Sequence, residues 1–107
     1  MAAQPDQQPV LDLLASMTAE SMEAASNLDA DTLMLVRIAA LVAVDAPAGS
    51  YLMNLGVAAD TGVEPEQVQS VLAAVAPIVG APRVVSAAGR MADALGVAID
   101  LNQAGAS

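Results

Sequence analysis

The sequence predicts an all-α fold, a compact bundle of five to six helices. Apolar residues make up 56% of the 107 residues, and they recur at helical spacing along most of the chain. Proline and glycine stand where such segments would begin and end. No alternating run of apolar and polar residues is long enough for a strand. The length corresponds to one domain.

The polar N-terminal segment, residues 1–8, is expected to be disordered, and the helical domain is expected over residues 9–96. Large apolar residues at helical spacing predict a first helix over 9–17. Thr18 could cap a short second helix over 19–26. The apolar positions of the first helix are Val10, Leu11, Leu13, Leu14 and Met17.

The clearest helical segment is NLDADTLMLVRIAALVAV. Asp29 suits the N-cap, and Asp31 in the first turn complements the helix dipole. Residues 38–44 are apolar on every face, so we expect this helix to be buried centrally or to lie in a subunit interface. It should end near Asp45, because Pro47 disfavours helical geometry in the residue before it.

Two more helices follow from proline and glycine positions. Pro47 can open a helix that stops at Gly62, in the left-handed conformation common after a helix end. Glu64 then stands near the cap of the next helix, with Pro65 at its first position. Pro77 should kink or end that helix before Gly80.

Pro82 can open the last helix, which we expect Gly96 to terminate. Residues 97–107 then form a short C-terminal tail with an extended piece.

The residue inventory excludes much chemistry. The chain has no cysteine, no histidine and no lysine, which removes thiol redox chemistry, Cys/His zinc sites, Schiff-base catalysis and histidine-based nucleophile activation. No loop spacing indicates a Mg²⁺ or Ca²⁺ site. We therefore expect no metal, no cofactor and no catalytic residue, and the inventory favours a protein that is not an enzyme.

The charge and the composition also bear on partners. A net charge of −9 opposes binding to nucleic acid and to anionic membranes. No segment is apolar enough to cross a bilayer and the N-terminus has no signal-peptide pattern, so a cytoplasmic location is expected. An alanine-rich core with one aromatic residue buries little area, and small domains of this kind gain burial by forming oligomers.

The order of four segments resembles the carboxymuconolactone decarboxylase and alkylhydroperoxidase D-like family. These segments are LDADTLMLVRIAAL, PAGSYLMN, TGVEPEQVQSVL and APIVGAP. The resemblance covers roughly residues 28–95. It implies the family's helical fold and assembly into homo-oligomers, as trimers or hexamers.

The redox branch of that family carries Cys-x-x-Cys-x-x-x-His at the start of one helix. In the register of the resemblance, Pro47 and Ser50 stand at the two cysteine positions and Asn54 at the histidine position. Leu35 stands where the family keeps an assisting glutamate. Thiol peroxidase activity by this chain is therefore excluded. The decarboxylase branch also uses a histidine, which this sequence lacks.

Six residues remain as candidates for binding a small organic acid or lactone. Pro47, Ser50 and Asn54 share one helical face. The Ser50 hydroxyl would more simply cap the first turn, and Asn54 would pair with a backbone group at a subunit contact. Tyr51 could be a general acid or part of a pocket wall, but an isolated tyrosine is more often packed with its hydroxyl at the surface or at an interface. Arginines can clamp a carboxylate, although salt bridges at the surface or between subunits explain them as well. The candidates are Ser50, Tyr51, Asn54, Arg37, Arg83 and Arg90.

Three functional hypotheses follow. The first is a non-redox, oligomeric member of the family whose altered site is packed or binds a small organic ligand. The second is a cofactor-free decarboxylase or isomerase that acts on a small lactone or carboxylic acid. The third is a scaffold or partner subunit of a catalytic homologue, in which a second chain completes a site.

Overall fold

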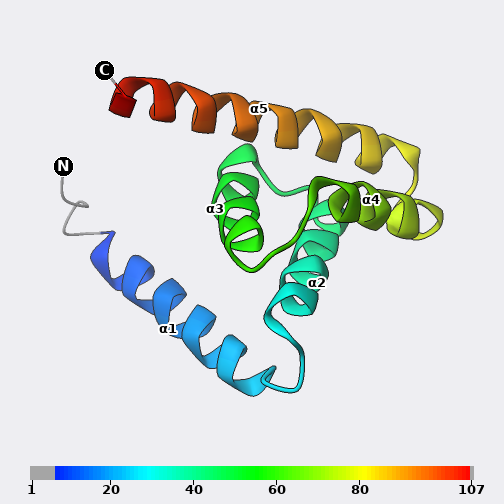
Figure 1. Ribbon diagram of the computed structural model, residues 1–107. Helices are drawn as coiled ribbons and strands as arrows, with labels where there is room; N and C mark the ends of the chain where they lie inside the picture. The colour runs from blue at the N-terminus through cyan, green and yellow to red at the C-terminus, as the bar shows by residue number, and fades with distance from the viewer. Residues whose placement is uncertain (1–6, 107) are drawn as a thin grey trace.

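The computed structural model describes the backbone of residues 7–106 and the side chains of residues 7–96. It contains five helices and, within those residues, no strand, which confirms the all-α prediction. Helices α2 to α5 pack on one another, and α1 extends away from them (Figure 1). The helices are α1 (Gln8–Ala24), α2 (Ala30–Ala43), α3 (Ala48–Asp60), α4 (Pro65–Val79) and α5 (Ala81–Ala106).

Helix α2 is the centre of the core, because it packs against α3, α4 and α5. Its buried side chains are Leu33, Met34, Ile38 and Val42. Of the two expectations, central burial or a subunit interface, central burial holds for one face of the helix, whereas Val36 and Val44 are 53% and 71% exposed. Two clusters of buried residues meet on it, one towards the α2–α3 turn and one towards the α3–α4 turn. The first contains Val42, Ala46, Tyr51, Leu72, Ala87 and Ala94, and the second contains Met34, Ile38, Ala58 and Val63.

Backbone geometry at the end of α3 explains why the chain reverses there. Gly62 has a φ of 95°, a left-handed conformation that only glycine adopts without strain. Its N–H bonds the Ala59 carbonyl, and the next N–H, from Val63, bonds the Ala58 carbonyl. This pair of bonds is a Schellman motif, which satisfies the last carbonyls of α3. The predicted glycine stop is therefore confirmed.

The start of α4 also follows the sequence. Glu64 is the N-cap, Pro65 is the first helical residue, and the Gln67 side-chain oxygen accepts a bond from the Glu64 N–H at 2.8 Å. Together with the Glu64 side chain this forms a capping box. Pro77 lies inside α4, which ends two residues later at Val79 before Gly80.

The predicted division of the first helical region is wrong. Residues 8–24 form the single helix α1, and Thr18 lies within it instead of capping a second helix. No glycine or proline interrupts the segment after Pro9, and Ser16 and Thr18 cost a helix only tenths of a kcal/mol each. Of the segment 1–8 predicted to be disordered, Gln8 begins α1, and residues 1–6 lie outside the described part.

The predicted end of the last helix is also wrong. Helix α5 begins at Ala81 and continues through Gly96 to Ala106, where an extended piece was expected. Gly96 does not take the left-handed φ that ends a helix at Gly62. A glycine inside a helix costs only about 1 kcal/mol, which ten further helical residues offset. No helix in the described part of the chain is long and apolar enough to cross a membrane.

The role of Gly62 gives a test with a matched control. Gly62→Ala should lower the free energy of unfolding by about 1–2 kcal/mol, because an L residue is strained at a φ of 95°. Gly89→Ala, in the middle of α5 with open space around its Cβ, should raise that free energy by up to about 1 kcal/mol. Urea unfolding followed by circular dichroism measures both. Equal effects of the two substitutions would contradict the assigned backbone conformations.

Candidate functional site

The turn between α2 and α3 leads directly into the PAGSYLMN segment, which forms the start of α3. Asp45 takes a left-handed conformation with a φ of 55°, and it is the non-glycine residue with a positive φ in the described chain. The Asp45 N–H bonds the Val42 carbonyl at 3.2 Å, and the Ala46 N–H bonds the Leu41 carbonyl at 3.0 Å. This is a second Schellman motif, with aspartate where glycine is usual. Pro47 then becomes the N-cap of α3.

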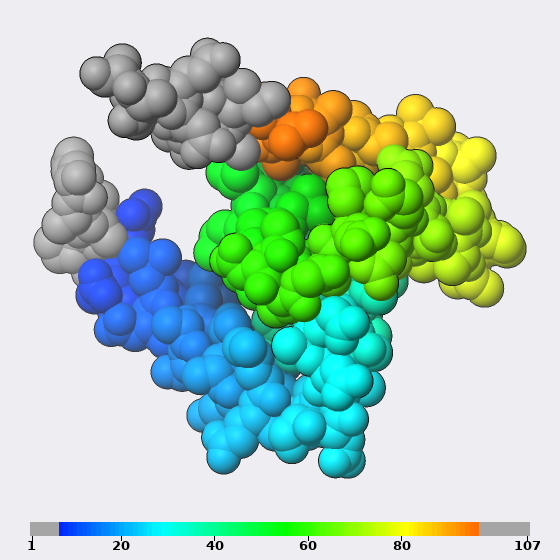
Figure 2. Space-filling model, in the orientation of Figure 1, coloured from blue at the N-terminus to red at the C-terminus, as the bar shows by residue number. Residues whose placement is uncertain are grey.

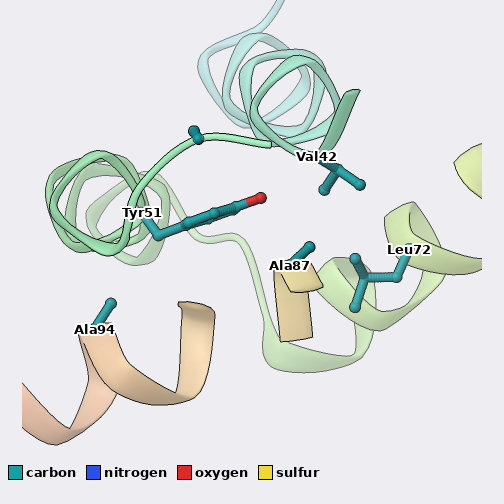
Figure 3. Packing of buried hydrophobic residues seen from close by; sticks show 6 residues of the cluster. Val42, Tyr51, Leu72, Ala87 and Ala94 are labelled. Atoms are coloured by element: carbon teal, nitrogen blue, oxygen red, sulfur yellow. The ribbon is translucent and has the colours of Figure 1, made fainter. Parts of the chain in front are cut away.

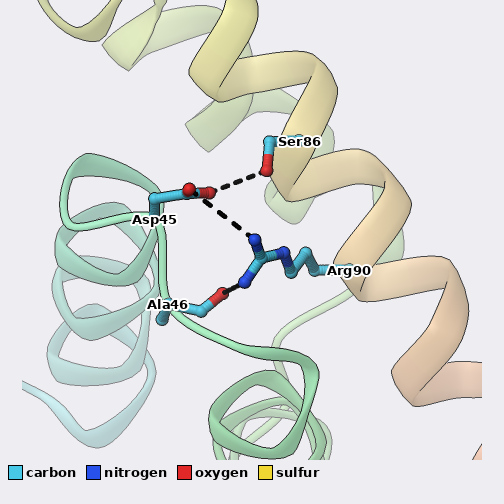
Figure 4. Close-up of polar contacts among 4 residues, drawn as sticks. All are labelled: Asp45, Ala46, Ser86 and Arg90. Atoms are coloured by element: carbon cyan, nitrogen blue, oxygen red, sulfur yellow. Dashed lines mark hydrogen bonds and ion pairs between the residues drawn. The ribbon is translucent and has the colours of Figure 1, made fainter.

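The side chain of Asp45 connects this turn to α5 (Figure 4). Ser86 donates its hydroxyl to Asp45 at 2.7 Å, and the Arg90 guanidinium lies 3.6 Å from the other carboxylate oxygen. Arg90 also donates to the Ala46 carbonyl at 3.1 Å. These contacts hold Asp45 in a conformation that costs an L residue about 1–2 kcal/mol. Arg90 is thus engaged within its own chain.

Tyr51 is the largest fully buried side chain of the core, with no exposed surface. Its ring extends from α3 towards Val42 on α2 and Ala87 on α5 (Figure 3). The hydroxyl was expected at the surface or at an interface, but it is buried with the ring and has no hydrogen-bond partner among the described residues. Burial raises the pKa of Tyr51 above its ordinary value of 10.0, the Asp45 carboxylate raises it further, and Arg90 opposes both. Tyr51 is therefore a neutral packing group at physiological pH.

Asn54 and Ser50 form a local contact on α3. The Asn54 amide donates to the Ser50 backbone carbonyl at 2.8 Å, one turn earlier, and both residues are half-buried. The sequence suggested pairing with a backbone group at a subunit contact, whereas the backbone partner lies one turn earlier in the same helix. The Ser50 hydroxyl caps nothing in the described part of the chain: the cap of α3 has no side-chain hydrogen bond. The Ser50 N–H bonds the Pro47 carbonyl at 3.0 Å.

The three arginines do not converge. Arg37 on α2 donates to the Ser21 hydroxyl of α1 at 3.2 Å. Arg90 is paired with Asp45, and Arg83 is exposed near the start of α5. The six residues predicted to bind a ligand therefore lie in separate contacts. Among described residues, no group of three or more acidic, histidine or cysteine side chains could hold a metal ion.

A cavity lies elsewhere, and sequence reasoning missed it. A groove of about 430 Å³ opens between the second half of α3, the start of α4 and the middle of α5. None of the six predicted residues lines it. Its wall is apolar apart from Glu64 and Gln69. The sequence indicated an apolar face on each of the three helices, but it gave no indication that these faces would leave a groove between them. The groove is hereafter the α3–α5 groove, lined chiefly by Leu55, Val63, Val68, Leu72, Met91 and Leu95.

Comparison with protein families decides the classification. The family model of the carboxymuconolactone decarboxylase family, compared with this sequence, matches residues 8–94, which is most of the chain. The chain belongs to the carboxymuconolactone decarboxylase family. Comparisons with curated proteins and with solved structures gave no significant match.

Within this family, the resemblance placed the reactive positions at a helix start, and the structure puts those residues there. Pro47 is the N-cap of α3, Ser50 lies in the first turn, and Asn54 lies one turn further. Leu35, at the position of the assisting glutamate, is partly buried against the second core cluster.

The unpartnered hydroxyl of Tyr51 predicts a pH effect. Because burial raises the pKa in the folded state, the associated stability is fully present below pH 10.0 and is lost as the pH rises through the folded pKa. The chain has no lysine and no cysteine, so few other groups titrate in that range. Urea unfolding of wild type should therefore show a fall in the free energy of unfolding as the pH rises above 10.0, which Tyr51→Phe should remove.

At neutral pH, Tyr51→Phe should leave the free energy of unfolding unchanged or raise it by about 1 kcal/mol, because it removes a buried donor without a partner. A loss of that size would show that the hydroxyl has a partner. Tyr51→Ala is the matched cavity control and should cost about 3–5 kcal/mol.

The Asp45 contacts predict an order of two substitutions. Asp45→Asn keeps an acceptor for Ser86 and a side chain that tolerates the left-handed conformation. It loses only the partly exposed ion pair with Arg90, so the free energy of unfolding should fall by less than about 1 kcal/mol. Asp45→Ala loses both properties and should cost about 1–3 kcal/mol. Thermal unfolding measures the difference. Equal losses would mean that the ion pair alone stabilises the turn.

Proposed function

We propose that this protein is a non-redox member of the carboxymuconolactone decarboxylase family that works as a homo-oligomeric structural module without catalysis. In this proposal the former reactive face of α3 has become packing. The oligomer brings together copies of one acidic domain, and no cofactor takes part.

One observation carries the proposal: Tyr51 and Asn54 of the PAGSYLMN segment are used in contacts within their own chain. Tyr51 has no exposed surface, and the Asn54 amide bonds the Ser50 carbonyl at 2.8 Å. A site for a small ligand needs a concave space with a few polar groups directed into it. No side chain of the PAGSYLMN segment lines the larger groove, and the second cavity, of about 210 Å³, takes only Leu52 from that segment and has no polar side chain in its wall.

The alternative of a cofactor-free decarboxylase or isomerase finds less support. It needs an arginine to hold a carboxylate beside Ser50, Tyr51 and Asn54. Arg90 contacts Asp45 and Ala46, and Arg37 contacts Ser21. Tyr51, with its raised pKa, is a weaker acid than a free tyrosine and is closed to substrate.

Self-association is supported by the amount of apolar surface that one copy leaves exposed. The six large apolar side chains of α1 are each about half exposed: Val10, Leu11, Leu13, Leu14, Met17 and Met22. Exposed apolar patches of this extent on soluble proteins mark interaction surfaces.

A thermal-shift screen tests the absence of a ligand site on α3. Wild type and Asn54→Leu are compared with small carboxylic acids and lactones. We expect no ligand-dependent shift in either, and an Asn54→Leu melting temperature close to that of wild type. A ligand at a hundred times its Kd would add about 2.7 kcal/mol, a shift of several degrees.

The control for that screen is Gln69→Leu, the same kind of change placed in the α3–α5 groove. A ligand that stabilises wild type and Gln69→Leu but not Asn54→Leu would show that α3 carries a working site, and the proposal would fail. A ligand lost only in Gln69→Leu would place a site in the groove and would also contradict a purely structural role.

A further inference from the structure

Helix α1 stands outside the packed core of its own chain. No other helix of the described residues packs against it, whereas α2 to α5 all pack on one another or on α2. One side-chain bond reaches it, from Arg37 to Ser21 at 3.2 Å. Figures 1 and 2 show it as a separate arm along one side of the molecule. A helix of 17 residues is marginally stable in water unless its apolar face is covered.

The apolar face of α1 is well formed. Val10, Leu13, Leu14 and Met17 follow the spacing of one helical face, and between 52% and 59% of each side chain is exposed. Asp12 and Glu23 lie on the opposite side by helical geometry, and Glu20, seven residues after Leu13, lies at the edge of this face. The helix therefore offers a stripe without charge, although the whole chain carries a net charge of −9.

The α3–α5 groove is the complementary surface in the same molecule. Its wall is apolar apart from Glu64 and Gln69, and Leu95 is 61% exposed. Alanines at 58, 59, 88 and 92 form part of its wall, and small side chains let a helix approach closely. Its volume of about 430 Å³ can take several leucine-sized side chains. Because each copy has one uncovered helix and one open groove, two copies can satisfy both features by exchange.

We infer that α1 of one copy packs into the α3–α5 groove of a second copy, and that the second copy returns its own α1 in the same way. This inference rests on the self-association proposed above and names the surfaces that make it. The four side chains of the stripe, each slightly more than half exposed, present roughly 400 Å², and with a matching area on each groove the two contacts together come within the ~1,200–2,000 Å² of stable interfaces.

Charge favours this occupant as well. With the stripe of α1 turned inward, Asp12 and Glu23 remain in water and Glu20 lies at the rim of the contact, so no acid of α1 is enclosed. Glu64 lines the groove but is exposed in one copy, and the stripe carries no like charge to repel it. A contact between two α1 helices alone would leave both grooves open.

Mass measurements on four variants test the inference by analytical ultracentrifugation. Wild type should sediment as an oligomer. Leu14→Glu on the α1 stripe and Leu95→Glu in the groove should each sediment as one chain of 10.6 kDa. Two controls should sediment like wild type: Ala19→Glu, on the opposite side of α1, and Val85→Glu, exposed on α5 outside the groove.

The decisive sample is an equal mixture of Leu14→Glu and Leu95→Glu. One intact pair of surfaces is left in the mixture, the α1 of the Leu95→Glu chain and the groove of the Leu14→Glu chain. A dimer should therefore form in the mixture and in neither variant alone, with a weaker affinity than wild type. A mixture of folded chains that stays monomeric would overturn the inference.

The outcomes separate the two proposals. A wild type that sediments as one chain would refute self-association itself and the inference with it. An oligomeric Leu95→Glu together with a monomeric Leu14→Glu would leave self-association intact and refute the groove as its surface.

A second measurement applies if a glutamate variant fails to fold. The chain has no cysteine, so single cysteines can be cross-linked with a flexible bis-maleimide without background. Leu14→Cys mixed with Ala92→Cys should give a heterodimeric product in excess over Ala19→Cys mixed with Ala92→Cys. Equal yields would contradict the packing of α1 in the groove.

Discussion

The fold depends on one aromatic ring enclosed by small side chains. Tyr51 is the sole aromatic residue of the sequence and is fully buried between α2, α3 and α5. Its neighbours in the cluster include Ala46, Ala87 and Ala94, which let three helices approach closely. The ring supplies volume that these alanines lack. The buried hydroxyl without a partner is an energetic cost that the packing of the ring offsets.

The position of Tyr51 depends on the turn before it. Asp45 ends α2 in a left-handed conformation, and Ser86 and Arg90 hold it from α5. The redox branch of the family has its reactive cysteines at the start of this helix. In this chain the start of the helix instead carries Tyr51, which packs between α2, α3 and α5. We propose that a structural junction has replaced a reactive one. The residues that would have carried chemistry contact their own chain.

A core of small residues has a second consequence. Helices α2 to α5 pack on one another without α1. The leucine, valine and methionine side chains of α1 therefore stay at the surface. An ordinary monomer would bury such side chains, because each contributes about 1.5–3 kcal/mol when removed from water. In the proposed assembly the groove of a second copy supplies that burial, and the isolated domain is incomplete.

Local residues predicted much of this fold, and non-local contacts decided the rest. Gly62 and the Glu64–Pro65 pair fixed the α3–α4 turn, since their conformational preferences are intrinsic. The prediction that Gly96 ends the last helix was wrong, because a glycine ends a helix only where it takes the left-handed conformation of a turn. The left-handed Asp45 depends on side chains more than 40 residues later, which no local pattern reveals.

The same distinction applies to the site. The resemblance put Ser50 and Asn54 at the start of the correct helix, but their partners depend on packing. The groove could not be predicted, since residues from three helices form it.

Hydrogen exchange of the α1 amides at a series of protein concentrations tests most directly whether this helix is stabilised by a second copy. The account predicts that protection of residues 8–24 falls on dilution, together with the groove-lining part of α5, while α2 stays protected. Protection of α1 that does not change with concentration would contradict it, because the helix would then be stable within a single chain.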